Sequence, residues 1–239
     1  MKIVRIATLI AVLAGLLLLA SGPGTRLGLW DFRTGISLMR WAVYAGLAGA
    51  ALGALGLLVP RLRRGQAAWL ACAVALGLGI AYGPWQAQRL ARSVPPIHDI
   101  TTDTLDPPAF VAILPLRADA PNPPEYAGAE IAEQQRAAYP DLQPLRLELA
   151  PAQAFQRAEA AARRQGWEIV AVEPLAGRIE ATATTLWFGF KDDVVIRVRG
   201  SDGASVLDLR SKSRVGRSDV GANAARIRAY LDELRKPAP

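Results

Sequence analysis

The sequence has one cysteine and one histidine in 239 residues, and this scarcity excludes several classes of site. Cys72 lies inside an apolar segment, so the chain beyond it has no disulfide, thiolate metal site or cysteine nucleophile. His98 stands alone, which excludes a second imidazole ligand and any Ser-His pair elsewhere. The lack of disulfides does not exclude an oxidising compartment, because a domain of this size can bury a sufficient core without them.

Acidic residues are nearly missing from the first 94 positions. That segment has ten Lys/Arg and one acid, Asp31, for a charge of +9, whereas residues 95–239 have 18 Lys/Arg and 20 Asp/Glu, for −2. The positive charge therefore flanks the apolar segments, where cations meet lipid headgroups. A nucleic-acid footprint would concentrate on the folded domain. The charge indicates membrane lipids as partners and no nucleic acid.

Residues 1–94 contain three apolar runs that predict an anchor of three transmembrane helices. At about 1.5 Å per residue, each run spans roughly 27 to 29 Å, close to the thickness of the hydrocarbon core. The runs are Ile3–Ala20, Trp41–Val59 and Ala67–Trp85. The first is expected to remain as a helix. The alternative, a cleaved signal peptide, fits Lys2 and Arg5 before the run, but Leu18-Leu19-Ala20 lacks a small-x-small cleavage site.

The short loop from Pro60 to Gln66 contains three arginines and predicts the orientation of the anchor. Short loops rich in Lys/Arg stay in the cytoplasm. With three helices, this places residues 95–239 in the periplasm, outside an inner membrane. Four arginines on the other side oppose this orientation: Arg26, Arg33, Arg89 and Arg92. The small-residue series Ala45, Gly49, Gly53 is expected to pack within the bundle rather than in a dimer.

Residues 95–141 read as a proline-rich acidic arm. Ten of the seventeen prolines fall in residues 95–144, and residues 95–149 have three arginines against nine acids, a charge of −6. Such composition favours irregular, extended chain. Residues 110–114 are expected to be a strand or a buried strap, and residues 127–138 a surface helix. We expect the arm to fold back onto the basic residues near the C-terminus and to bury Phe110 and Ile113.

Residues 142–239 predict an α+β two-layer domain. Alternating apolar positions indicate strands at 145–149, 167–172, 178–187, 192–199 and 205–210, and Gly-containing links join the last three as hairpins. Helices are expected after Pro151 and around residues 220–234, each with an apolar stripe. The predicted fold is an antiparallel sheet with both helices on one face and a solvated opposite face.

Several runs in this half resemble a known family. They are IHDITTD, AYPDLQPL, GWEIV, IEATATTLWFGFKDD and RSKSRVGRSDVGANAARI. Together they are similar to the uncharacterised bacterial family catalogued as domain of unknown function 1499, in its long form with an N-terminal membrane anchor. The resemblance implies a protein of the cell envelope. It supplies no activity and no catalytic residues.

The first candidate site is an anion site at the start of the last helix. A helix N-terminus has free backbone N–H groups and a positive dipole end, and arginines add charge-assisted contacts. The residues proposed for it are Lys212, Arg214 and Arg217, which we name the basic turn, and the adjacent Ser218. The alternative, which is favoured, is a capped turn whose arginines pair with the acidic arm.

The second candidate is the group His98, Asp99, Asp103 and Asp106. One imidazole with several carboxylates resembles the ligands of a divalent metal, but the spacing matches no known motif. An ordinary polar turn or ion pairing is favoured for these residues, with His98, Asp99 and Asp103 as arm contacts, and no metal or cofactor is predicted. An acid/base pair of Glu180 with Asp192 or Asp193 is disfavoured, because these residues fit a solvated strand face and a turn.

The third candidate is the aromatic cluster Trp187, Phe188 and Phe190, with Leu186. It is expected to join the core, with Trp187 and Leu231 on opposite sides of the sheet–helix interface. Insertion at the membrane surface, or a lipid pocket, is the alternative.

These features predict a membrane-anchored envelope module that binds a partner protein or an anionic ligand such as a lipid headgroup. An enzyme is disfavoured, and no catalytic residue is assigned. The alternative function is a hydrolase or transferase that uses the His98 and Asp99 region with the basic turn. The sequence leaves the oligomeric state open.

Overall fold

The computed structural model describes residues 2–236, and the chain divides into two compact units. The first consists of Met1–Arg89 together with Leu186–Gly189. The second consists of Leu90–Thr185 together with Phe190–Pro239.

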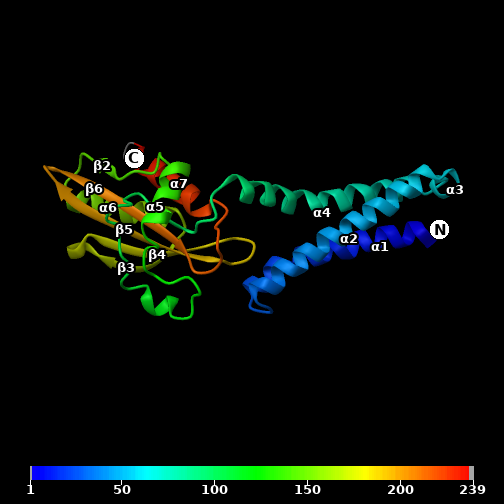
Figure 1. Ribbon diagram of the computed structural model, residues 1–239, viewed down its shortest axis with the longest axis horizontal. Helices are drawn as coiled ribbons and strands as arrows, with labels where there is room; N and C mark the ends of the chain where they lie inside the picture. Colours follow the sequence, from blue (N-terminus) through cyan, green and yellow to red (C-terminus); the bar gives the residue numbers. More distant parts are fainter. Residues whose placement is uncertain (1, 237–239) are drawn as a thin grey trace. The chain divides into compact units, whose positions relative to one another are not determined.

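Three long helices form the anchor and confirm the predicted helical count. They are α1 (Lys2–Arg26), α2 (Phe32–Leu58) and α4 (Ala67–Ser93), and the short helix α3 (Pro60–Arg63) lies in the connection between α2 and α4 (Figure 1). The segments Val4–Arg26, Phe32–Leu58 and Ala67–Ser93 are each long and apolar enough to cross a membrane. The protein therefore carries a helical membrane anchor.

Small residues of α2 allow close packing inside the anchor. A Cβ added at Gly49 would lie 3.2 Å from the Ala7 carbonyl oxygen of α1. One added at Gly53 would lie 2.9 Å from the Leu70 carbonyl oxygen of α4. This confirms the expectation that the small-residue series packs within the bundle, because each glycine lets the backbone of another helix approach.

The C-terminal domain is built on a six-stranded sheet in the order β1-β6-β5-β4-β3, with β2 also paired to β6. All pairings are antiparallel. The strands are β1 (Asp99–Thr101), β2 (Leu145–Leu147), β3 (Glu168–Glu173), β4 (Arg178–Thr184), β5 (Lys191–Ser201) and β6 (Ala204–Ser213). Short 3₁₀ helices η1 (Leu114–Arg117) and η2 (Pro174–Ala176) lie in the arm and between β3 and β4.

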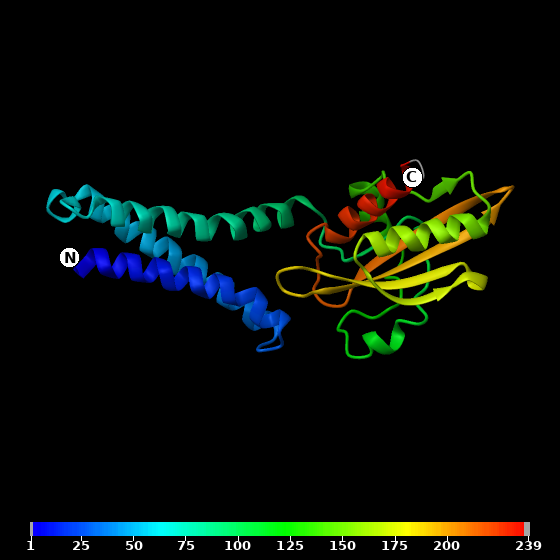
Figure 2. The same cartoon turned by 180° about the vertical axis from the view of Figure 1, so that it is seen from behind.

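Helices α6 (Pro151–Arg164) and α7 (Ala222–Arg235) cover one face of this sheet (Figures 1 and 2). Their apolar stripes meet Ile179, Ile196 and Leu209 of the strands in one buried core. At its edge, Trp167 stacks on Tyr230 with ring centroids 5.2 Å apart. The predicted fold class, a helical anchor followed by an α+β domain with two helices on one sheet face, is confirmed.

The arm covers the opposite face of the sheet. Phe110 and Ile113 are 6% and 0% exposed and pack on Val195 of β5, so the apolar contacts expected of the arm are present. The expectation of a solvated face is therefore wrong. The reason is that the arm joins the sheet through β1, and the segment after β1 crosses this face before helix α5 (Ala129–Ala138) begins.

The core position expected for Trp187 is also wrong. Trp187 is 40% exposed and Leu186 is 84% exposed, and neither belongs to the core cluster that contains Leu231. Residues Leu186–Gly189 group with the helical unit and not with the sheet. Strand β4 ends at Thr184, so the aromatic cluster lies beyond the part of the hairpin that faces α7.

Candidate functional site

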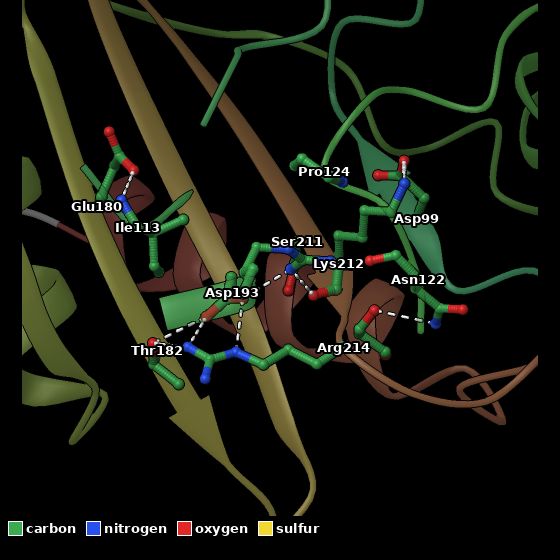
Figure 3. Close-up of polar contacts among 12 residues, drawn as sticks. Asp99, Ile113, Asn122, Pro124, Glu180, Thr182, Asp193, Ser211, Lys212 and Arg214 are labelled. Carbon is green, nitrogen blue, oxygen red and sulfur yellow. Dashed lines mark hydrogen bonds and ion pairs between the residues drawn. The ribbon is translucent and has the colours of Figure 1, made fainter. Parts of the chain in front are cut away.

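Lys212, the first cation of the predicted anion site, is buried within β6 and does not lie in a turn. Its Nζ donates to Asp99 Oδ2 at 3.0 Å and to the Glu125 carbonyl oxygen at 2.6 Å. Arg210 forms a bidentate pair with the same carboxylate, with both distances 2.8 Å. Burial lowers the pKa of Lys212, and the charge of Asp99 acts in the opposite direction. One carboxylate of the arm thus pairs with two cations of β6 (Figure 3 shows the Lys212 contact).

Arg214 is likewise paired inside the domain. Its Nε and Nη2 donate to the two carboxylate oxygens of Asp193 at 2.9 and 2.8 Å. Arg117 of the arm donates to Asp193 at 2.6 Å, and the Thr182 hydroxyl donates at 2.8 Å (Figure 3 shows the Thr182 and Arg214 contacts). Burial lowers the pKa of Arg117, while the adjacent Asp193 raises it. Asp193, expected in a turn, is fully buried at the centre of this cluster.

The arm reaches the basic turn through Asn122. Its side-chain Nδ2 donates to the carbonyl oxygens of Ser213 at 3.1 Å and Gly216 at 2.9 Å. Its backbone N–H donates to the Arg214 carbonyl oxygen at 3.1 Å. The arm therefore folds onto the turn as expected, but an amide makes the contact where arm carboxylates on Arg214 were predicted.

Asp103 and Asp106 contact arginines of β5. Arg197 and Arg199 each lie 3.4 Å from Asp103, and 2.9 and 3.2 Å respectively from Asp106. Both arginines also pair with the buried Asp208 of β6, at 2.9 and 2.7 Å. The arm contacts proposed for Asp103 are thus directed at the sheet.

Glu180 supports the arm from beneath. Its carboxylate is fully buried and accepts the backbone N–H groups of Val111, Ala112 and Ile113 at 3.0 to 3.1 Å (Figure 3 shows the Ile113 contact). These donors precede η1 and would otherwise be unsatisfied. The residue expected on a solvated strand face therefore organises a loop 67 to 69 positions away in sequence.

Arg217 and Ser218 occupy the loop before α7. The Arg217 side chain is exposed, and its carbonyl oxygen lies 3.3 Å from His98 Nδ1. The Ser218 hydroxyl accepts the Val220 N–H at 3.2 Å. Asp219 accepts the N–H groups of Gly221 and Asn223 at 2.7 and 2.9 Å, and burial raises its pKa. The Asp219 carboxylate thus accepts hydrogen bonds from backbone N–H groups at the start of α7 that were expected to bind an external anion.

The helix-facing side of the same strands contains a second polar group. Ser211 donates to Asn223 Oδ1 at 2.6 Å, and Asn223 Nδ2 donates to Ser213 Oγ at 3.0 Å. Arg226 bonds Ser211 at 3.0 Å, Asn223 at shorter range and Asp192 at 2.6 Å. These hydrogen bonds satisfy the buried hydroxyl groups at the end of β6 with side chains of α7.

Within the described part of the chain, the hydrogen bond of the His98 ring is to the backbone and not to a nucleophilic side chain. The ring contacts the Arg217 carbonyl oxygen, while neighbouring Asp99 is committed to Arg210 and Lys212. Across residues 2–236, no three His, Cys, Asp or Glu side chains are grouped to hold a metal ion.

The outward side of the arm is apolar. Val111, Leu114 and Leu116 are 48%, 41% and 53% exposed within six residues, and we name this set the arm ridge. Beneath it, Ile113 and Arg117 are buried at 0% and 3%. A short segment therefore alternates between buried attachments and exposed apolar side chains.

A family model described as "Protein of unknown function (DUF1499)" matches residues 99–234, more than half of the chain. The chain belongs to the DUF1499 family. The matched region begins at β1 and ends one residue before the end of α7, so the DUF1499 domain includes the arm as well as the sheet. A comparison with curated proteins found no match.

Two residues that organise this DUF1499 domain, Arg117 and Asn122, were not singled out from the sequence, and two others, Glu180 and Asp193, were assigned to a solvated face and a turn. The available signal was the polar face of the strands, which contains both acids and arginines. A charged face of mixed sign next to a segment with apolar anchors is compatible with burial. The pairing itself depends on which arm residue lies over which strand, and no local pattern specifies that.

Proposed function

We propose that the protein is a non-enzymatic module of the cell envelope, anchored in the inner membrane, whose periplasmic domain binds a partner protein through the arm ridge. The observation that carries this proposal is the distribution of polar and apolar groups. The charged side chains of the covered sheet face are paired with one another, whereas Val111, Leu114 and Leu116 are exposed.

Catalysis is disfavoured by the same distribution. A general acid or base must reach its substrate with a free lone pair or proton. Asp99, Asp193 and Glu180 are 0 to 1% exposed, and each is bound by two or more donors of the domain. Of the four ligands proposed for an external anion, Lys212 and Arg214 are already paired with Asp99 and Asp193, which leaves Arg217 and Ser218. A protein partner therefore fits the domain better than an anionic ligand.

The arm ridge has the properties of a preorganised binding surface. Clustered exposed apolar side chains mark interaction sites, and a surface that is already ordered loses less entropy on binding. Order is supplied by Glu180 on the backbone of Val111 and Ile113, and by Arg117 on Asp193.

Site-specific photo-crosslinking in the full-length protein tests the proposal. A photoreactive residue at Leu116 should give a discrete protein adduct in cells, whereas one at Leu175, which is fully exposed in η2, should not. Leu114→Asp should abolish the Leu116 adduct and Leu175→Asp should leave it intact. Equal labelling at both positions, or no protein adduct at Leu116, would contradict the proposal. Adducts to lipid alone would replace the protein partner by the membrane surface.

A further inference from the structure

The anchor contains a cavity of about 490 Å³ beside α1, at the end of the helices that carries the arginine loop. Five residues of α1 line it at spacings of one, three, one and three: Val4, Arg5, Thr8, Leu9 and Val12. These positions form one stripe of a helix. Gln66 and Trp69, at the start of α4, form the opposite wall.

Packing elsewhere in the anchor explains why this space stays open. The neighbouring stripe of α1, which includes Ala7, Ala11 and Ala14, is 0 to 1% exposed, and Ala7 and Ala11 pack against Gly49 of α2. Further along, a Cβ at Gly15 would lie 3.7 Å from Ile80 of α4. Toward the arginine loop, the α1 stripe from Arg5 to Val12 meets the cavity instead. The cavity is open on one side, so an acyl chain of a close-packed bilayer can enter and fill it.

The charge around the cavity is positive and unbalanced. Arg5 lines it, and the exposed Arg61, Arg63 and Arg64 lie in the adjoining loop. Within the described part of the chain, none of these four arginines makes an ion pair with an acidic side chain. The only acid among residues 1–94 is Asp31, which caps α2 at the other end of the anchor through Arg33 and Thr34. The counter-charge must therefore come from outside the anchor.

We infer that this cavity binds one anionic phospholipid. An acyl chain lies against Leu9, Val12 and Trp69, and the phosphate lies at Arg5, whose guanidinium offers a planar set of donors. Gln66 supplies an uncharged donor beside it. Trp69 is 59% exposed at the start of α4, the position that indole prefers at a membrane interface. The inference depends on the three helices spanning a membrane and is independent of the arm ridge.

Native mass spectrometry of the full-length protein, released from bilayers of equal phosphatidylglycerol and phosphatidylcholine, tests this site. The wild type should retain one phosphatidylglycerol. Arg5→Gln should reduce its retention at least tenfold, whereas Arg33→Gln, at the opposite end of the anchor, should not. Val12→Trp fills the cavity and should abolish retention, whereas the adjacent Leu13→Trp, which does not line the cavity and is 54% exposed, should preserve it.

Three results would overturn the inference: equal retention of both lipids, equal losses in the two arginine variants, or unchanged retention in Val12→Trp. If Val12→Trp fails to fold, Trp69→Ala and Trp41→Ala decide the same question. Both tryptophans are more than half exposed, but only Trp69 lines the cavity. Loss of lipid should be confined to Trp69→Ala, and equal behaviour of the two variants would contradict the site.

Discussion

Asp99 sits at 1% exposure between two cations, Arg210 and Lys212, that are themselves 2% and 1% exposed. Removing charges from water costs several kcal/mol each, so such a cluster persists only while every member is paired. Arg210 remains protonated in a protein, whereas a lysine can respond to burial by losing its proton. The lowered pKa of Lys212 is consistent with that difference.

We expect Asp99→Asn to destabilise the domain by about 3–5 kcal/mol, because it leaves two buried cations without their carboxylate. Asp141→Asn is the matched control. Asp141 pairs with Arg228 at 2.5 Å, but both side chains are 41 to 52% exposed. That change should cost at most about 1 kcal/mol. Thermal unfolding of the full-length protein in detergent, followed by near-ultraviolet circular dichroism, compares the two variants, and similar midpoints would contradict the buried network.

Tyr126 provides a pH-dependent prediction. Burial, with a smaller contribution from Asp99, raises its pKa to about 12, and its hydroxyl is buried without a hydrogen-bond partner among the described residues. Because the pKa in the folded state exceeds the value of about 10 in the unfolded state, the tyrosine ionises more readily when unfolded. Its contribution to stability is complete below pH 10 and is lost as the pH rises toward 12.

Tyr126→Phe should therefore leave stability at pH 7 unchanged or slightly higher and should reduce its loss between pH 10 and 12. Tyr230→Phe is the contrasting variant, because the Tyr230 hydroxyl donates to the Ala158 carbonyl oxygen at 2.8 Å. Its removal should cost about 1 kcal/mol at pH 7. Unfolding midpoints from pH 7 to 12, with phenolate absorbance at 295 nm, measure both effects. A larger loss at pH 7 in Tyr126→Phe than in Tyr230→Phe would contradict this assignment.

At the scale of elements, the arm depends on a few attachments to the sheet. Glu180→Gln keeps the size of the side chain but removes the charge and one of the two acceptor oxygens that receive the N–H groups of residues 111–113. Hydrogen exchange of those amides should accelerate by at least tenfold. Glu148→Gln is the control, since Glu148 is 79% exposed and pairs with the neighbouring Arg146. Unchanged exchange in Glu180→Gln would show that the apolar anchors hold the arm without it.

The elements also show how far sequence reasoning reaches. The spacing of apolar residues located the strands and both core helices. An element that buries one face repeats its apolar residues every two positions in a strand and every 3.6 positions in a helix. This pattern stopped β6 at Arg210, because Ser211 and Ser213 replace apolar residues on the helix-facing side. They are buried there because Asn223 of α7 bonds both. β1 was missed because three residues close to prolines have too short a pattern, although Asp99 pairs in register with Lys212.

The candidate site shows the corresponding limit for side chains. The pattern singled out Lys212 and Arg214, but it did not indicate their partners, which lie up to 113 positions away in sequence. Ion pairing at that separation is fixed by strand order and by the path of the arm, which local composition does not encode. The aromatic position in the core was likewise assigned to Trp187, whereas Trp167, stacked on Tyr230, occupies it.

At the scale of the whole molecule, charge separates the chain into a cationic anchor and a domain near neutrality, at +9 and −2. Cations in short loops hold a helix end in the cytoplasm because they resist translocation. Five Lys/Arg accompany the arginine-loop end in the sequence: Lys2, Arg5, Arg61, Arg63 and Arg64. Five lie toward the other ends: Arg26, Arg33, Arg40, Arg89 and Arg92. The two counts are equal, so the predicted orientation rests on the three arginines of the short loop between α2 and α4.

We therefore expect alkaline phosphatase to be active when fused after Pro239 and silent when fused within residues 60–66. Replacing Arg61, Arg63 and Arg64 by Gln should lower the activity of the C-terminal fusion, because the remaining cations favour the opposite orientation. Replacing Arg26, Arg33 and Arg89 by Gln is the matched control and should leave that activity unchanged or higher. The reverse pattern in the two wild-type fusions would place the domain in the cytoplasm, and the partner sought through the arm ridge would then be a cytoplasmic protein.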